Sequence, residues 1–224
     1  MRKNLLFLTV LVFSLVSLPL WAQGPRGFSW FFQGSVLFFP EDNGLESGPM
    51  PVLPAPGVGA AYSFNNVFKM GLSMDIYSTH YGYSDNLNRP VPDEIENRTA
   101  RVLGFILALE TAVHINFNPT VSLRIFGGPA ADLRLVMTAM GLTEGLDDMA
   151  DIRKRTDLVR EYFWSEGRWF TPYMGLGMCF RMNPRFRAGI DFRVWAPAYR
   201  LWIEEELPPI EGWRFGPGIR FTIR

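Results

Sequence analysis

Four residues near position 80 have the side-chain types that hydrolytic enzymes use. In chain order they are Ser78, His80, Ser84 and Asp85. A serine activated by a histidine base, with a carboxylate to orient that base, attacks the carbonyl carbon of an ester such as a lipid. The spacing of these residues matches no known esterase motif. The sequence therefore predicts a polar loop base at this position and no enzymatic activity.

Metal and cofactor chemistry has little support in the sequence. The chain has two histidines, and His114 has no second histidine nearby. The one cysteine, Cys179, excludes an intramolecular disulfide and argues against a zinc site built from cysteines. We therefore expect no metal site and no cofactor.

The composition indicates a folded chain that is rich in strands and turns. Hydrophobic residues make up 48% of the 224 residues and charged residues 20%, which excludes a disordered tail. Lys and Arg total 22, as do Asp and Glu, which argues against a protein held to nucleic acid by bulk charge. Aromatic residues at 15%, with 21 Gly and 17 Pro, favour β structure with many turns.

The first 22 residues have the layout of a secretory signal peptide. Arg2 and Lys3 precede an apolar stretch over residues 4–18, and Ala22 supplies a small residue at the end. We expect cleavage after Ala22, with residues 23–224 forming a single barrel domain. An uncleaved anchor helix is the alternative, because the apolar stretch is close to the length that spans a bilayer.

Three short segments share one pattern, in which an Asn and the two residues after it are bracketed by apolar side chains. They begin at Asn65, Asn118 and Asn183. Asn and Pro favour turns, because Asn tolerates a left-handed backbone and Pro fixes φ. The flanking residues alternate with period two, which is typical of strands. A three-residue hairpin loop pairs apolar with apolar residues at each site, for example Ile115 with Leu123, whereas a two-residue loop would pair opposite faces.

This alternation predicts an all-β chain with eight strands. We expect the strands at about 27–39, 56–64, 68–80, 101–117, 121–136, 168–182, 186–199 and 213–224. The three tight turns alternate with four long connections, at 40–55, 81–100, 137–167 and 200–212. The predicted fold is an eight-stranded antiparallel up-and-down transmembrane β-barrel.

The two faces of the predicted strands indicate a barrel with its apolar side outward. The polar face is rich in small residues such as Gly57, Gly59 and Gly177, which suit the narrow interior of eight strands. The apolar face carries large side chains such as Leu72 and Met174, as the lipid-facing side of a membrane barrel does. A soluble barrel that carries a lipid is the alternative, since it also alternates but has its apolar face inward.

Aromatic side chains gather near both ends of the predicted strands, as in the interfacial girdles of membrane barrels. Near the tight turns and the C-terminus these are Phe64, Phe68, Phe117, Phe180, Phe186 and Phe221. Near the long connections these are Tyr77, Trp169, Phe170, Tyr199 and Trp213.

A signal peptide, eight alternating strands, three tight turns and four long loops resemble the small outer-membrane β-barrels of diderm bacteria. The OmpX-like and OmpW-like groups and the barrel domain of OmpA are similar in this pattern, which covers essentially all of the mature chain. The resemblance implies periplasmic turns and termini, extracellular loops, contact with outer-membrane lipid and insertion by the barrel-assembly machinery. That machinery usually reads a last strand that ends in an aromatic residue, and the final Arg224 departs from this pattern.

The predicted inward face carries eight basic and four acidic residues. They are Lys69, Asp75, Glu110, Arg124, Asp132, Arg134, Arg181, Arg187, Asp191, Arg193, Arg214 and Arg220. Within this face we expect a lumen charge cluster of Glu110, His114, Arg124, Asp191 and Arg193. Isolated buried charges are costly, so these groups should pair and form a salt-bridge plug. A small or gated channel is the alternative, and its basic excess would favour anions.

The long connection at 137–167 contains a predicted amphipathic helix over residues 145–163. Apolar residues recur there at roughly helical spacing, at Leu146, Met149, Ile152, Val159 and Phe163. We expect this helix to cap the barrel, and contact with lipid headgroups or with a partner is the alternative.

The sequence thus predicts a bacterial outer-membrane barrel with a structural or small-solute permeability role. Its expected partners are outer-membrane lipid and a small solute or host ligand, and no nucleic acid. The second hypothesis is a surface adhesin that acts through the four long loops. The third is a soluble periplasmic lipid carrier.

Overall fold

The structure is a computed structural model that describes residues 27–40, 52–93, 100–138, 149–203 and 212–224. The expected signal peptide and parts of all four long connections lie outside these residues. Within the described ranges, no helix is long and apolar enough to cross a membrane.

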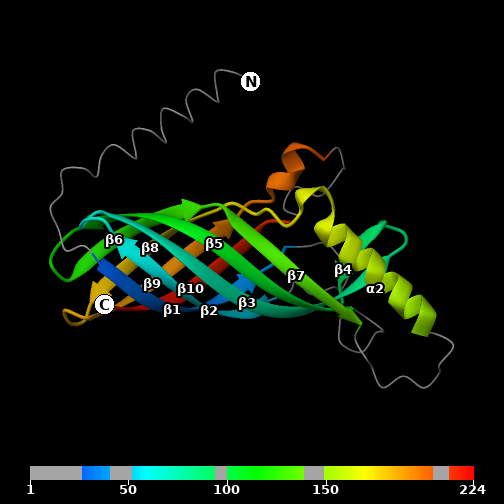
Figure 1. The fold of residues 1–224 in the computed structure, drawn as a ribbon, viewed down its shortest axis with the longest axis horizontal. Coiled ribbons are helices and arrows are strands. Elements are labelled where there is room, and N and C mark those ends of the chain that lie inside the picture. The colour runs from blue at the N-terminus through cyan, green and yellow to red at the C-terminus, as the bar shows by residue number, and fades with distance from the viewer. Residues whose placement is uncertain (1–26, 41–51, 94–99, 139–148, 204–211) are drawn as a thin grey trace.

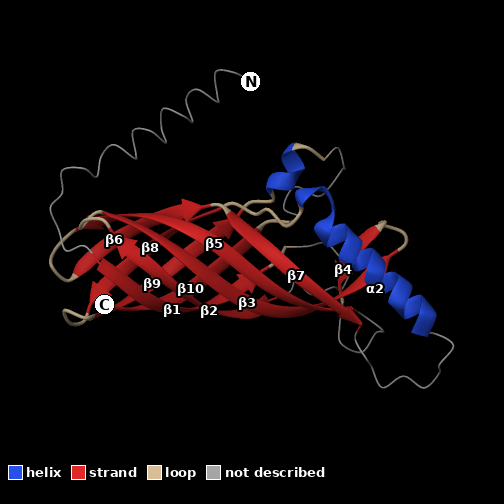
Figure 2. Ribbon diagram, in the orientation of Figure 1, coloured by secondary structure: helices blue, strands red, loops and turns tan. Residues whose placement is uncertain are grey.

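The wall is a closed ring of antiparallel strands, with the helices gathered near one end (Figures 1 and 2). The strands are β1 (Gly27–Phe38), β2 (Val52–Ser63), β3 (Phe68–Ser84), β4 (Arg89–Pro92), β5 (Ala100–Asn116), β6 (Val121–Gly128), β7 (Ala130–Thr138), β8 (Tyr173–Arg181), β9 (Phe186–Trp195) and β10 (Arg214–Ile223). Neighbouring wall strands follow the order β1, β2, β3, β5, β6 with β7, β8, β9 and β10, and β10 pairs with β1. The predicted eight-stranded antiparallel barrel is confirmed.

The ring has eight strands although ten are labelled, because β6 and β7 are parts of one wall strand and β4 lies outside the ring. β6 and β7 form one wall strand that is interrupted at Pro129, a residue without a backbone N–H. The ladder continues across the interruption, because the Leu109 N–H donates to the Pro129 carbonyl at 3.0 Å. β4 pairs only with the end of β3, so it lies outside the ring.

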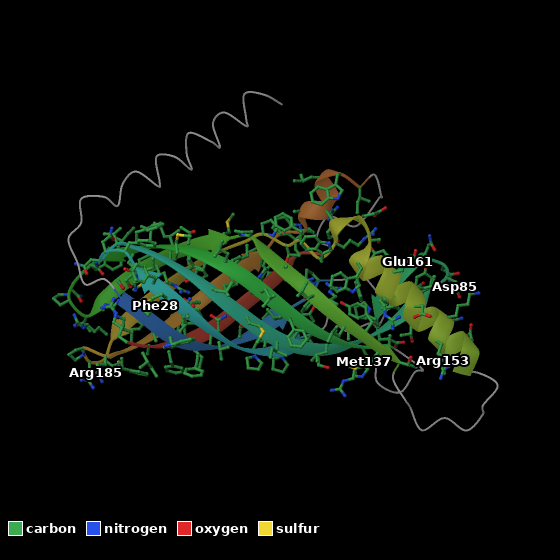
Figure 3. The ribbon with its side chains drawn as sticks, in the orientation of Figure 1. Phe28, Asp85, Met137, Arg153, Glu161 and Arg185 are labelled. Atoms are coloured by element: carbon green, nitrogen blue, oxygen red, sulfur yellow. The ribbon has the colours of Figure 1, made fainter. Side chains whose placement is uncertain are left out.

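All three tight turns lie at one end of the barrel, which we call the turn end, and the strand ends that the long connections join lie at the opposite end, which we call the loop end (Figure 1). The predicted three-residue register is confirmed at each turn, as in the pairs Ser63–Lys69, Ile115–Leu123 and Phe180–Ala188. Figure 3 shows Arg185 at the turn end and Glu161 near the loop end.

The turn asparagines act through their side chains and not through a left-handed backbone. The Oδ1 atom of Asn118 accepts hydrogen bonds from the N–H groups of residues 120 and 121, at 2.8 and 2.7 Å. Asn65 and Asn183 accept the equivalent pairs of bonds. Among the described non-glycine residues, only Asn88 and Glu166 have positive φ. The side-chain oxygen therefore closes each turn, as in an Asx turn.

The side chains confirm a barrel with its apolar face outward. Trp30 is 68% exposed and Met174 70%, whereas Asp75 is 1% exposed and Arg214 2%. This is the inverse of a soluble barrel and matches a lipid-facing wall around a polar interior. Two of the expected girdle residues are wrong, because Tyr77 and Tyr199 are buried.

Several predicted boundaries are also wrong. β2 begins at Val52, so part of the connection expected at 40–55 is strand, and β8 begins at Tyr173 instead of 168. The connection expected at 81–100 contains the end of β3 and all of β4. The predicted 145–163 helix is α2 (Met149–Trp164), and residues 145–148 lie outside the described chain.

Helix α2 covers an open strand edge at the loop end. β7 pairs with β5 along its length, but β8 does not reach the outer half of β7. Arg160 donates to the Val136 carbonyl at 3.3 Å, and the indole N–H of Trp164 donates to the Arg134 carbonyl at 3.1 Å. The buried face of α2, with Val159 at 0% exposure, packs on the ends of β3, β5 and β7. The helix therefore seals backbone groups that would otherwise form an exposed sheet edge.

Two short 3-10 helices complete the loop end. These are η3 (Ser165–Gly167), directly after α2, and η4 (Ala198–Leu201), after β9. The Trp202 indole N–H donates to the Glu166 carbonyl at 2.7 Å and joins the two. Helix α2 thus packs on the ends of β3, β5 and β7 at the loop end, and capping of the barrel by this helix stays a prediction.

Candidate functional site

The centre of the lumen holds a buried ion-pair cluster around Glu110 on β5. Its carboxylate contacts Arg124 of β6 at 3.1 Å and Arg220 of β10 at 2.8 Å. Arg124 also contacts Asp191 of β9 at 2.6 Å. All four side chains are at most 6% exposed. One carboxylate therefore accepts from two guanidinium groups, and one guanidinium bridges two carboxylates.

Two ion pairs cross the full width of the lumen. β5 and β10 are four strands apart in either direction around the ring, as are β3 and β9. Glu110 with Arg220 joins the first two walls, and Asp75 with Arg193, at 2.7 Å, joins the second two. Gln33 of β1 donates to the other oxygen of Asp75 at 2.8 Å. These side chains act as crossbars in an interior that is narrow enough to be filled by side chains.

A second cluster lies closer to the loop end, around Asp132 of β7. Arg134 and Arg214 both contact its Oδ2 atom at 2.6 Å, and the Tyr77 hydroxyl donates to the same carboxylate at 2.8 Å. The two clusters and the separate Asp75–Arg193 pair together engage four lumen carboxylates, at Asp75, Glu110, Asp132 and Asp191, in charge-assisted contacts.

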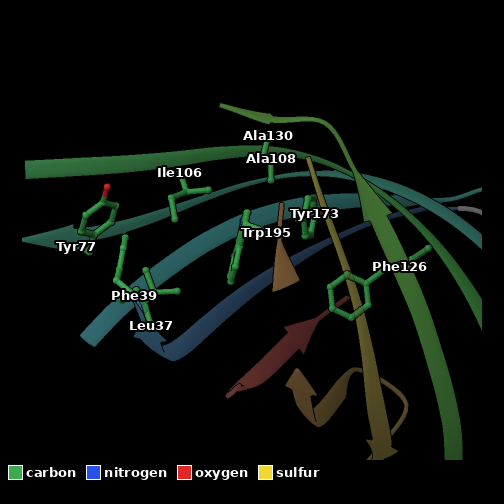
Figure 4. Packing of buried hydrophobic residues seen from close by; sticks show 11 residues of the cluster. Leu37, Phe39, Tyr77, Ile106, Ala108, Phe126, Ala130, Tyr173 and Trp195 are labelled. Carbon is green, nitrogen blue, oxygen red and sulfur yellow. The ribbon is translucent and has the colours of Figure 1, made fainter. Parts of the chain in front are cut away.

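Aromatic rings pack against the arginine side chains of the lumen. The guanidinium carbons of Arg220 and Arg124 lie 3.4 and 3.8 Å from the ring centres of Phe31 and Phe126. Figure 4 shows the apolar part of the interior, including Trp195, enclosed by the strands. Stacking on aromatic faces suits the weakly hydrated guanidinium group. The arginine side chains of the lumen therefore pack against aromatic rings as well as against carboxylates.

The predicted lumen cluster is assembled in part. The structure joins Glu110, Arg124 and Asp191, whereas Arg193 pairs with Asp75, which was not in the predicted cluster. His114 is buried and lies opposite Arg124 in register, yet its Nδ1 atom has no hydrogen-bond partner in the described structure.

Other residues of the lumen ion pairs were not part of the predicted charge cluster. Arg220, Asp75 and Asp132 were on the expected inward face but outside the predicted cluster. The aromatic partners of the arginines share that inward parity, as Phe31 on β1 and Phe126 on β6 show. In the sequence, these aromatic residues could have been found as bulky side chains on the strand face whose other residues are polar or small.

The hydrolase-type residues do not converge. Ser78 and His80 lie on the face of β3 that points away from the lumen, opposite in parity to buried Tyr77. In the described residues the His80 ring makes no hydrogen bond to either serine, and Asp85 contacts Arg155 at 3.4 Å. The ranges covered by the structure also hold no group of three or more potential metal ligands. The arrangement thus offers neither a triad nor a metal centre.

Comparisons with known proteins bear on the fold. No known family description matches the chain, and no curated protein matches it in sequence. The outer membrane protein OprG of Pseudomonas aeruginosa aligns with a TM-score of 0.51 and 9% identity, over 91% of this chain and 99% of that one.

Two further solved structures are similar. Neisserial surface protein A aligns over 89% of this chain and 98% of its own, with 8% identity and a TM-score of 0.48. The attachment invasion locus protein Ail of Yersinia pestis, solved with the heparin analogue sucrose octasulfate, aligns over 90% and 97%, with 11% identity and a TM-score of 0.44. The closed ring and its likeness to OprG together show that this chain has the fold of the small eight-stranded outer-membrane β-barrels.

Proposed function

We propose that this protein is a structural barrel of the bacterial outer membrane with a closed lumen, and that it is not an open solute pore. The observation that carries this proposal is the pair of crossbars, Asp75 with Arg193 and Glu110 with Arg220. A solute on the barrel axis would have to break buried, charge-assisted contacts between opposite walls. Removing one partner of such a pair is strongly unfavourable, at roughly 3–5 kcal/mol.

The outward apolar face supports the membrane setting. Large side chains such as Trp30, Leu72 and Leu176 are more than half exposed on the wall. Exposed apolar surface of this extent belongs in lipid and not in water. We propose that the turn end faces the periplasm and that the loop end, with α2, faces the outside of the cell.

The geometry argues against the lipid-carrier alternative. A carrier needs an apolar cavity that holds most of a lipid, on the scale of several hundred Å³. The interior described here is instead crossed by ion pairs, and a cavity near Glu110 has a volume of about 30 Å³.

Single-channel conductance in planar bilayers tests the closed lumen. We expect no discrete conductance steps from wild-type protein, from Glu110→Gln, or from the control Glu161→Gln, an exposed change on α2. Reproducible steps in wild type whose size changes in Glu110→Gln, but not in Glu161→Gln, would establish a pore and reject the proposal.

A surface-binding role is a second candidate, favoured by one observation. Exposed apolar side chains gather on and beside η4 at the loop end, with Leu201 86% and Trp202 53% exposed. Attachment of cells expressing wild type or Leu201→Ser to immobilised host cells tests this role. Equal attachment at equal surface expression would remove this patch from consideration.

A further inference from the structure

A small cavity lies in the lumen between the Glu110 cluster and the turn end. Its volume is about 30 Å³, roughly twice what a single water molecule requires. The lining comes from several strands and includes Lys69 of β3, His114 of β5 and Arg187 of β9. Arg187 is only half-buried, so this end of the cavity approaches the mouth of the barrel.

The basic side chains that line the cavity outnumber their acidic partners. Arg124 and Arg220 both contact Glu110, the one carboxylate in the lining. Lys69 is 8% exposed, and neither it nor Arg187 makes an ion pair within the described chain. An ammonium group held out of water without a counter-charge is costly. Two cations on opposite sides of one cavity therefore lack a partner that the protein itself supplies.

His114 adds a ring nitrogen without a partner to the same space. It is 5% exposed, and its Nδ1 atom has no hydrogen-bond partner in the part of the chain that the structure describes. Buried polar atoms are almost always hydrogen-bonded. An unpaired ring nitrogen of a residue that lines a cavity therefore indicates a hydrogen-bond partner within that cavity.

We propose that this cavity is a binding site for a small oxyanion, with inorganic phosphate as its test ligand. Lys69 supplies a compact positive charge, Arg187 a planar fork of donors, and His114 an imidazole nitrogen that can donate, and all three are groups that bind oxyanions in proteins. The lone carboxylate is already occupied by two guanidinium groups, so it does not repel an anion as a free carboxylate would. The site does not depend on whether the lumen conducts.

The only cysteine provides a reporter, because Cys179 lines the same cavity. The rate of Cys179 alkylation by iodoacetamide, a small neutral reagent, is measured on folded protein in maltoside micelles, which contain no phosphate. Phosphate is titrated against chloride at constant ionic strength. The expected result is a saturable decrease in rate, reaching about elevenfold at ten times the dissociation constant.

The described residues offer a matched pair of lysines for the control. Lys69→Met removes the buried ammonium, and Lys154→Met removes an exposed one on α2. We expect phosphate protection to be lost in Lys69→Met and kept in Lys154→Met. A heat-modifiable band on a gel identifies folded protein, and His114→Phe replaces Lys69→Met if that variant does not fold.

Three results would overturn the proposal. They are an unchanged rate as phosphate replaces chloride, protection that survives in the Lys69 or His114 variant, and protection that appears only after phosphatidylglycerol is added. The last of these would assign the cavity to a lipid headgroup and would reject a free oxyanion site.

Discussion

Arg193 and Asp75 meet across the whole width of the barrel, with Nη1 and Oδ2 2.7 Å apart, although 118 residues separate them in the chain. Their side chains are 4% and 1% exposed. The contact joins two strands that are not neighbours in the sheet, because β3 and β9 stand on opposite walls. The pair therefore links opposite walls of the barrel across its interior.

The stability of the barrel should depend on this pair. Asp75→Asn leaves Arg193 buried without its counter-charge, and we expect a loss of roughly 3–5 kcal/mol in the free energy of unfolding. Urea titration of protein refolded in liposomes, followed by tryptophan fluorescence, measures this loss. The control is Asp157→Asn, which breaks an equally short but exposed pair with Arg160 and should cost at most about 1 kcal/mol. Equal losses in the two variants would show that the crossbar has no special role.

Glycines on the inward face should be intolerant of even one methyl group. A Cβ at Gly177 would collide with the Asp191 carboxylate, whereas a Cβ at Gly34 would meet nothing closer than Ile219 at 3.9 Å. We expect Gly177→Ala to lose roughly 1–3 kcal/mol through overpacking, and Gly34→Ala to remain close to wild type. The same urea titration measures the stability of both variants. A Gly177→Ala variant as stable as wild type would show that the Asp191 carboxylate does not pack closely against this position.

The turn asparagines should be replaceable by Asp but not by Ala. Asn118→Ala removes an acceptor of two backbone N–H groups, and the expected loss is about 1 kcal/mol in stability. Asn118→Asp keeps an acceptor oxygen in place and should refold like wild type. Refolding yield, read as the fraction of heat-modifiable protein, distinguishes them, and equal yields for Ala and Asp would contradict the side-chain mechanism.

Helix α2 should detach when its buried face is charged. Val159→Asp places a carboxylate where the wild-type side chain is fully buried, so we expect trypsin to cleave at Lys154 faster than in wild type. Glu161→Ala, on the exposed face of the same helix, is the control and should leave the rate unchanged. Equal cleavage of all three proteins would show that α2 does not hold the β7 edge.

The barrel could be predicted because period-two alternation and turn chemistry are local properties. The register at Asn118 follows from which loop length keeps Ile115 and Leu123 on one face, and the structure has that pairing. The outward position of residues such as Leu72 follows from the same alternation together with the small residues on the other parity.

The partners across the lumen could not be predicted, because parity places a residue inside without giving its height along the axis. Arg193 therefore could not be matched to Asp75, four strands away, and was expected only as a member of a cluster that did not include Asp75. The docking of α2 could not be predicted for a similar reason. The strand edge at Val136 is open only because β8 begins at Tyr173 and does not pair with the outer half of β7. Tyr77 was assigned to a girdle from its position near a strand end, but its hydroxyl binds Asp132 inside.

The most direct test of the membrane barrel is cell fractionation, followed by gel migration with and without boiling. A membrane barrel with lipid-facing side chains such as Trp30 and Met174 should appear in the outer-membrane fraction and require detergent for extraction. Its folded band should shift on boiling, as the closed ring of strands unfolds. Recovery as a soluble periplasmic protein, without a heat-dependent shift, would contradict the assignment of the apolar face to lipid.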